Sequence, residues 1–436
     1  MERGFTWLAI VRLGAVQASI GAMVMLATSL LNRLMVVEYG LMAAIPAGLV
    51  AWHYAVQLSR PVWGHGSDKG RERTPWIHAG MAVLALGTLT AVNATVLLDS
   101  NPVLGTIMAI LAFTLIGGGV GAAGTSLLAL LASGVVPERR AAAAAVTWIM
   151  MVSGIVISAA TAGALLDPYS EQRLALVASG VALTALGVSW LAVFRLERHA
   201  LPVRTTAESG DAVDFRTALQ DIMQEPQARW FTVFIFVSMF AYSMQDLILE
   251  PFAGLVFGMT PGQSTQLSGL QHGGVLIGMI VTGVCGSAFA GRLPFDLRHW
   301  IVLGCLGSAL SLVGLAMAAM SGGGWPLQLN VFALGFCNGT FAVAAIGSMM
   351  GLAGSGLRSG EGIRMGVWGA AQAIAFAMGG LMGALGVDIA RRAQQHDGAA
   401  FQFIFALEAA VFILAAALAL KATSRNQGQS TRMVQA

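Results

Sequence analysis

The sequence predicts an all-α integral membrane protein of about twelve transmembrane helices, arranged as two groups of six. Three observations lead to this fold class. Hydrophobic residues make up 56% of the 436 residues and charged residues only 10%, which is too few charges to cover a soluble globule of this length. Apolar runs long enough to cross a bilayer recur along the chain, and a single charged stretch near its middle separates them into two equal groups.

A helix needs roughly 20 apolar residues to cross the hydrocarbon core. The N-terminal half, residues 1–194, holds the first six expected spans, and the C-terminal half, residues 230–420, holds the other six. We expect residues 421–436 to be a disordered tail. The expected spans are 13–37, 43–60, 76–98, 103–133, 141–166, 174–194, 230–257, 267–290, 300–320, 327–354, 365–386 and 401–420.

Residues 195–229 form a charged linker between the two halves, because charges of both signs replace the apolar pattern there. Within it, residues 214–226 can form a short surface helix, since four apolar side chains share a face at helical spacing. We interpret the segment as a solvated cytoplasmic linker. Docking of a soluble partner is the alternative.

The distribution of the cations predicts the topology. If the N-terminus is cytoplasmic, the twelve-span arrangement places all Lys and Arg residues on the cytoplasmic side except Arg33, Arg173, Arg391 and Arg392. The positive-inside rule therefore predicts that both termini are cytoplasmic. The net charge of +3 reports this topology and gives no indication of nucleic-acid binding.

Two carboxylates stand inside the apolar run from Trp230 to Met259. An ionisable side chain within the hydrocarbon costs at least ~2.5 to 3.5 kcal/mol, so Asp246 and Glu250 need partners or water. They are four residues apart, which places them on one helical face, and Gln245 stands beside them. Pro251 lacks a backbone donor, so the helix can bend there. This pattern indicates a functional or interhelical site.

The two halves look like internal repeats. Residues 31–35 hold the place in the first span that residues 244–248 hold in the seventh. Six plus six helices around a charged central loop is the layout of the major facilitator architecture. Its loop motif between the second and third spans has the members Gly64, Asp68, Lys69, Arg71 and Arg73. We expect its acid to cap and pair with cations at neighbouring helix ends.

The repeat relation gives the buried carboxylates a partner. The first span offers Asn32, Arg33 and Glu38. If the pseudo-two-fold axis brings the first and seventh spans together, Arg33 can pair with Asp246, which leaves Glu250 or Glu38 to titrate or bind. A structural ion pair and a ligand-binding or proton-coupling role both remain open.

Several segments of the chain resemble the PucC family, which consists of major-facilitator-like proteins of phototrophic bacteria. The resemblance covers essentially the whole membrane region. It rests on Gln245-Asp246-Leu247-Ile248-Leu249-Glu250-Pro251-Phe252 and residues 254–259 and 273–279, on Leu31-Asn32-Arg33-Leu34-Met35, on Arg73-Thr74-Pro75-Trp76, and on Gly366-Val367-Trp368-Gly369. Residues 53–61 look closest to the branch of the family labelled as a bacteriochlorophyll synthase chain.

The resemblance implies a multi-pass protein of the bacterial cytoplasmic or intracytoplasmic photosynthetic membrane. Its implied role is assembly of light-harvesting complexes by delivering bacteriochlorophyll to antenna polypeptides. The implied partners are the lipid bilayer, bacteriochlorophyll or a precursor, antenna polypeptides and bacteriochlorophyll-synthesis enzymes. Two alternatives stay open: a proton-coupled transporter of a small amphipathic solute, and an accessory subunit that stabilises a late enzyme of bacteriochlorophyll synthesis.

The synthase label implies an enzyme, and the residues argue against one. Prenyl transfer needs aspartate-rich helical motifs, whereas the single DxxD pattern, formed by Asp211 and Asp214, lies in the linker. The two lysines, Lys69 and Lys421, do not belong to a phosphate-binding loop. We therefore expect a protein without catalytic residues or a metal centre.

A bound bacteriochlorophyll would need a fifth ligand for its magnesium, and a neutral imidazole can supply one. The candidates are His53, which lies in the second span, and His272, which precedes two glycines that leave room for a flat ring. The alternative for each is a histidine that packs in the bundle with its hydrogen bonds satisfied.

Overall fold

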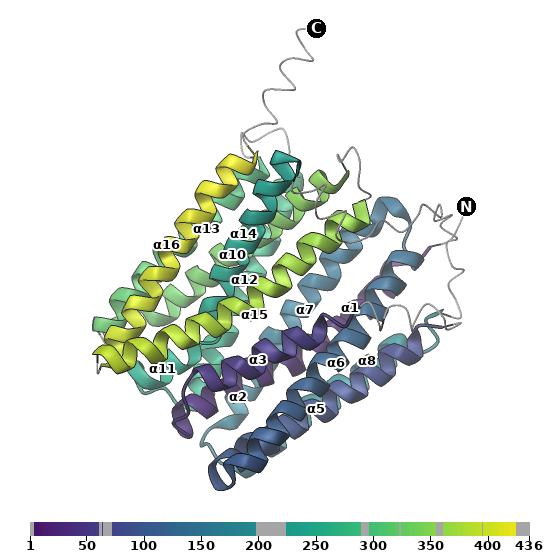
Figure 1. Cartoon of the computed structure of the whole chain (residues 1–436). Coiled ribbons are helices and arrows are strands. Elements are labelled where there is room, and N and C mark those ends of the chain that lie inside the picture. The colour runs from purple at the N-terminus through teal and green to yellow at the C-terminus, as the bar shows by residue number, and fades with distance from the viewer. Residues whose placement is uncertain are drawn as a thin grey trace.

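The computed structural model describes residues 4–60, 63, 72–197, 224–288, 296–321, 324–354, 361–394 and 396–423. Every regular element within these ranges is a helix, and the helices form one elongated bundle (Figure 1). Eleven of the described helices are long and apolar enough to cross a membrane. The predicted all-α membrane fold is therefore confirmed.

The first half of the bundle is built from helices whose starts are marked in the sequence. The side chains of Thr6, Asn101 and Ser170 accept hydrogen bonds from the first turns of α1, α6 and α8, as N-cap residues do. The elements are α1 (Trp7–Met25), the π-helices η1 (Leu26–Leu30) and η2 (Leu34–Glu38) on either side of α2 (Leu31–Arg33), α3 (Ala44–Gln57), α5 (Thr74–Ser100), α6 (Pro102–Gly134), α7 (Pro137–Leu166) and α8 (Glu171–Val193).

The second half has the same order of six spans, and its first span consists of two separate helices, α10 and α11. The elements are α10 (Pro226–Asp246), α11 (Leu249–Phe257), α12 (Pro261–Ala288), α13 (Leu297–Ser321), α14 (Leu327–Gly354), α15 (Glu361–Gln394) and α16 (Asp397–Thr423).

The second expected span, 43–60, corresponds to α3, which has 14 residues. At 1.5 Å per residue such a helix is about 21 Å long and does not cross a hydrocarbon core of roughly 30 Å by itself. Loop residues 64–71, linker residues 198–223 and tail residues 424–436 lie outside the described residues, as does most of the surface helix expected at 214–226.

Each half has its own hydrophobic core. The core of the first half extends along α1, α5, α6 and α8, and it also contains Leu247 from the second half. The core of the second half is aromatic: the rings of Phe231 and Trp368 meet edge to face with centroids 5.3 Å apart. Large apolar side chains such as Leu176 and Leu310, 75% and 74% exposed, cover the outside of the bundle, where they would face lipid.

Glycine allows α15 to lie close to α10. A Cβ atom at Gly383 would lie 2.7 Å from the carbonyl oxygen of Met244, and one at Gly380 would lie 2.7 Å from Leu247. Such close approach of backbones is what holds helices together in lipid, where hydrophobic association is absent.

The bundle has two distinct ends. Helix α1 begins and α16 ends at one of them, which we call the terminal end (Figure 1). Helices α3 and α12 begin at the opposite end, which we call the far end.

Candidate functional site

The seventh span is interrupted between its two carboxylates. Helix α10 ends at Asp246 and α11 begins at Leu249, so the interruption lies ahead of Pro251, where the bend was expected. The reason is that a proline deprives the carbonyl four residues earlier of its donor, and here that carbonyl belongs to Leu247. Asn32 from the first span supplies the missing donor: its Nδ2 atom donates to the oxygen of Leu247 at 2.7 Å.

The first span is irregular at the same level. Two π-helical turns, η1 and η2, lie on either side of Asn32 and Arg33. These two residues are only 2% and 1% exposed. Because π-helical turns hold one more residue than α-helical turns, they change which side chains face the neighbouring span, and they occur frequently at functional sites.

Arg33 is neutralised within its own span. Its Nη1 atom lies 2.5 Å from Glu38 Oε1, and its Nη2 atom donates to the carbonyl oxygen of Met259 at 2.7 Å. The predicted pair between Arg33 and Asp246 is therefore wrong. The physical reason is the π-helical turn, in which residues five apart come together, so that Glu38 reaches Arg33 first.

Glu250 lies in a group of hydroxyls contributed by both halves. The carboxylate is 2% exposed and accepts a short hydrogen bond from Ser29 of the first span. From α12, the hydroxyls of Ser264 and Thr265 lie 3.5 and 3.4 Å from Oε2. Ser29 also lies 3.0 Å from Ser268. The sequence-based prediction did not include these hydroxyls. Ser264, Thr265 and Ser268 nevertheless lie at helical spacing in an apolar span, which is a pattern that could have indicated them.

Asp246 has different neighbours, so the expectation that it shares one helical face with Glu250 is wrong. It lies near Tyr54 of α3 and Tyr242 of α10, whose rings are 5.8 and 5.7 Å from that of Phe376. Its Oδ1 atom is buried without a hydrogen-bond partner. The interruption after Asp246 separates the two carboxylates into two sites.

Two further buried side chains, Gln245 and Glu408, have no hydrogen-bond partner. Gln245 is fully buried, and neither atom of its amide has a hydrogen-bond partner. Glu408 of α16 is also fully buried, with both carboxyl oxygens unpartnered. Glu408 was not predicted as a site residue, although it is a lone carboxylate within the apolar span 401–420.

The two candidate histidines differ in which nitrogen is available. Gln57 accepts from Arg60, so its amide nitrogen is the group that donates to His53 Nε2 at 2.8 Å. That bond occupies the lone pair that a magnesium ion would need. In His272 the Nδ1 atom lies 2.9 Å from the carbonyl oxygen of Ser268 and donates to it, which leaves the Nε2 lone pair available.

The space beside His272 is open. The imidazole is half-buried, and a Cβ atom added to Gly273 would meet no atom within 4 Å. His272 therefore remains a ligand candidate. In His53 the bond from Gln57 occupies Nε2, while Nδ1 is buried without a hydrogen-bond partner.

Of the loop motif, Arg73 lies within the described residues; Gly64, Asp68, Lys69 and Arg71 do not. Arg73 donates to the hydroxyl of Ser133 on α6 at 2.9 Å. Glu197, which follows α8, accepts from the backbone nitrogens of Arg73 and Thr74 at 2.9 and 2.8 Å. The start of α5 is thus tied to α6 and to the end of α8.

At the far end, two aspartates join the halves in equivalent ways. Asp388 of α15 accepts from the backbone nitrogens of Ala43 and Ala44, where α3 begins, at 2.9 and 2.8 Å. Asp167, which follows α7, accepts from the Gly262 nitrogen at 3.1 Å and from the Thr260 hydroxyl at 2.6 Å, where α12 begins. The two contacts correspond under the repeat relation, because α7 and α15 are the fifth spans of their halves and α3 and α12 the second.

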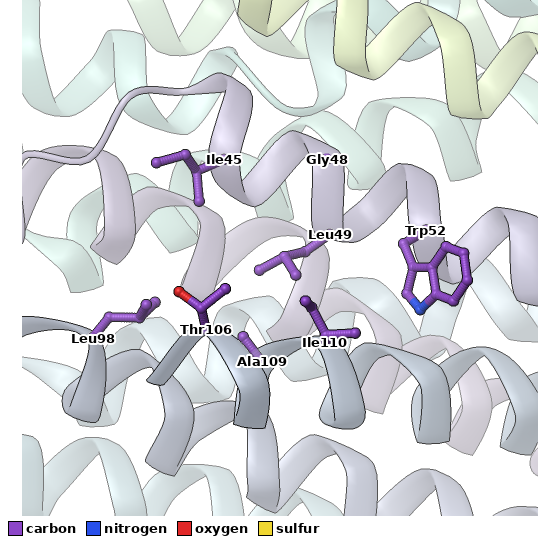
Figure 2. Close-up of a pocket in the computed structure, with 8 residues that line it drawn as sticks. All are labelled: Ile45, Gly48, Leu49, Trp52, Leu98, Thr106, Ala109 and Ile110. Atoms are coloured by element: carbon purple, nitrogen blue, oxygen red, sulfur yellow. The ribbon is translucent and has the colours of Figure 1, made fainter. Parts of the chain in front are cut away.

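An apolar groove of about 470 Å³ lies between α3, α5 and α6, apart from these polar sites (Figure 2). Trp52 stands at one end of it and donates through Nε1 to Thr114 at 2.8 Å. The shape and apolar lining suit a hydrocarbon chain. The lining residues are Ile45, Gly48, Leu49, Trp52, Leu98, Thr106, Ala109 and Ile110.

Comparison with known proteins identifies the family and the fold. The model of the family described as PUCC protein matches residues 30–427. A protein of Rhodobacter capsulatus named bacteriochlorophyll synthase 44.5 kDa chain is 50% identical over 417 residues, which cover 95% of each chain. The protein PucC of the same organism is 28% identical and covers 95% of this chain and 92% of its own length.

Solved structures of transporters share the fold at low identity. A D-xylose–proton symporter superimposes with a TM-score of 0.70 at 12% identity, over 95% of this chain and 97% of the other. A bacterial homologue of the human lysosomal transporter Spinster, inward-facing and occupied, gives 0.69 at 12% identity, over 95% of this chain and 96% of the other. The fold is therefore that of the major facilitator transporters.

Proposed function

Because this chain belongs to the PucC family, we propose that it is a membrane assembly factor for photosynthetic light-harvesting complexes. In this proposal it binds bacteriochlorophyll or a precursor and delivers it to antenna polypeptides, or couples pigment synthesis to their assembly. The proposal rests on the family match over residues 30–427 and on the 50% identity to a relative named bacteriochlorophyll synthase 44.5 kDa chain. These similarities place the chain in bacteriochlorophyll or photosynthetic-complex biology.

The geometry around His272 supports a pigment as the cargo. A magnesium tetrapyrrole needs one axial ligand with a free lone pair and a flat space beside it. His272 offers its Nε2 atom, because Nδ1 donates to Ser268, and Gly273 leaves the adjoining space open. The apolar groove between α3, α5 and α6 also suits a hydrocarbon chain, but these helices are not among the main contacts of α12, so the groove is a separate site from His272 (Figure 2).

We infer that the chain itself is not the catalyst of pigment synthesis. The carboxylates near the centre of the bundle are spread over separate sites: Glu250 lies among hydroxyls, and Asp246 lies near two tyrosines. Within the described residues this arrangement offers no aspartate-rich face for a diphosphate, and the sequence contains no phosphate-binding loop. In this proposal, a partner enzyme and not this chain carries out the synthesis to which the relative's name refers.

The proposal is tested by purifying the chain in mild detergent from a host that makes bacteriochlorophyll, followed by absorption spectroscopy. We expect pigment to copurify with the wild type and to fall by about tenfold or more in His272→Ala, since the magnesium loses its axial ligand. His53→Ala is the matched control and retains the pigment, because Gln57 occupies the coordinating nitrogen of His53. Absence of pigment from the wild type, or equal loss in both variants, would contradict the proposal.

A second candidate is a proton-coupled transporter of a small amphipathic solute. The observation that favours it is Glu250, a buried carboxylate hydrogen-bonded to Ser29 of one half and to Thr265 of the other. Uptake into proteoliposomes driven by a pH gradient, and lost in Glu250→Gln, would support this candidate. A third candidate, an accessory subunit of a pigment-synthesis enzyme, predicts that such an enzyme copurifies in stoichiometric amount.

A further inference from the structure

The carboxyl group of Glu250 lies among four buried hydroxyl groups that come from both halves of the bundle. Ser29 belongs to η1 of the first half, and Ser264, Thr265 and Ser268 belong to α12 of the second. Ser29 contacts both Glu250 and Ser268, so the hydroxyls and the carboxylate form one connected group, which we call the Glu250 site. The site is rich in oxygen atoms and carries a single negative charge.

The hydroxyl protons do not fully satisfy this carboxylate. Ser29 donates to Oε1, but Ser264 and Thr265 lie 3.5 and 3.4 Å from Oε2. These distances exceed the range of about 2.5 to 3.0 Å that is usual for O–H···O bonds. Ser264 has one proton to donate, and it lies nearer to the carbonyl oxygen of Pro261, at 3.1 Å. The lone pairs of Ser264 therefore face Oε2, and two acceptors that face each other are stabilised by a cation between them.

The neighbouring arginine does not supply this positive charge. Arg33 bonds to Glu38 through Nη1 and to the carbonyl oxygen of Met259 through Nη2. It lies alongside the next turn of α11, since a Cβ atom added to Gly254 would lie 3.2 Å from its Nη2 atom. Arg33 and Glu38 neutralise each other, so the charge of Glu250 remains. A buried, uncompensated carboxylate is strongly destabilised and needs a proton or a bound cation.

The other described cations on the helices in main contact with η1, α11 and α12 lie near the terminal end, whereas α12 begins at the far end. Along the seventh span, about 30 Å of helical rise separates Arg229 from Glu250. His272, one turn beyond Ser268, donates through Nδ1 to the carbonyl oxygen of that residue. Arg60, which follows α3, donates to Gln57. The cations near the terminal end are Arg12, Arg73, Arg139, Arg140, Arg229 and Lys421.

The geometry of the site suits one small monovalent cation. Two oxygens that bind the same ion at right angles from about 2.4 Å lie about 3.4 Å apart, which matches the separations of Ser264 and Thr265 from Oε2. A divalent ion would overcompensate the single carboxylate, with Arg33 close by. The seventh span is interrupted just before Glu250, and interrupted helices hold sodium ions in other membrane proteins.

We propose that the Glu250 site binds one sodium ion at the boundary between the two halves. Its ligands are Oε2 of Glu250 and the hydroxyl oxygens of Ser264 and Thr265, while Ser29 of the first half holds the other carboxylate oxygen. Asn32, one turn after Ser29, has an Oδ1 atom that is buried without a hydrogen-bond partner, so a further oxygen is available on the adjoining turn. The bound ion neutralises a carboxylate that both halves contact.

Binding of radioactive sodium to the purified full chain tests this site. The chain is kept in choline chloride at constant ionic strength and neutral pH. We expect saturable binding of one ion per chain, which unlabelled sodium displaces and potassium does not. Affinity should fall about tenfold or more in Glu250→Gln, which removes the charge, and in Thr265→Val, which removes one ligand oxygen. Thr161→Val is the matched control and retains binding, because the exposed Thr161 hydroxyl bonds to its own helix at 2.7 Å.

Three outcomes would overturn the proposal. They are the absence of saturable sodium binding at neutral and alkaline pH, which would leave Glu250 with a proton, unchanged affinity in both site variants, and equal displacement by potassium.

Hydrogen exchange of the wild type needs no variant, so a variant that fails to fold does not decide the result. Sodium should slow exchange at the start of α12, around Ser264 and Thr265, relative to choline, and an equal rate in both salts would also contradict the site. Neither pigment nor solute uptake enters these measurements, so their outcome is independent of the proposed function.

Discussion

At the residue scale, the shape of the seventh span depends on one backbone carbonyl. Pro251 removes the donor that would have paired with Leu247, and Asn32 replaces it from the other half. The sequence predicted both participants, because an asparagine and a proline in apolar spans are conspicuous. It did not predict that they act on the same carbonyl, since that depends on how the two spans lie against each other.

Asn32→Ala is expected to lower the free energy of unfolding by about 1 to 3 kcal/mol, because Leu247 is left with a buried, unpaired acceptor. Pro251→Ala restores a backbone N–H at the matching position, so the double variant should lose less than the sum of the single losses. Chemical unfolding in detergent measures both effects.

The matched control is Asn93→Ala, at an exposed asparagine that bonds to its own helix at 2.8 Å. We expect it to change stability by no more than about 0.5 kcal/mol. Strictly additive losses in the double variant would show that Asn32 and Pro251 do not share the carbonyl.

At the scale of helices, the far end is held by two reciprocal caps. Asp388 caps α3 and Asp167 caps α12, each from the opposite half. Carboxylates at helix N-termini accept from unpaired backbone N–H groups and interact favourably with the helix dipole. Because both caps cross between the halves, separating the halves at the far end would break them together.

Hydrogen exchange with mass spectrometry can distinguish the two caps. Asp388→Ala should increase exchange at the start of α3, around Ala43 and Ala44, and leave the start of α12 unchanged. Asp167→Ala should show the reverse pattern, with Gly262 affected. The expected cost of each is about 0.5 to 2 kcal/mol. Equal changes at both sites in each single variant would mean that the caps open as one unit.

At the scale of the whole molecule, the cations divide between the two ends of the bundle. Of the arginines that the structure describes, Arg173, Arg391 and Arg392 stand at the far end, while most of the others stand toward the terminal end. We predict from the positive-inside rule that the terminal end is cytoplasmic. Alkaline phosphatase fused after residue 423 should be inactive, and the same enzyme fused after Ser170 should be active. The opposite pattern would invert the topology.

The sequence by itself determined the membrane class, the helical fold and the positions of most buried charges, because hydropathy and length are local properties of each segment. The tertiary structure decided how those charges combine. It paired Arg33 with Glu38, enclosed Glu250 in hydroxyls from two halves, and left Glu408 fully buried without a hydrogen-bond partner. The physical reason is that two π-helical turns and one interrupted helix reorient side chains, and that packing joins helices far apart in the chain.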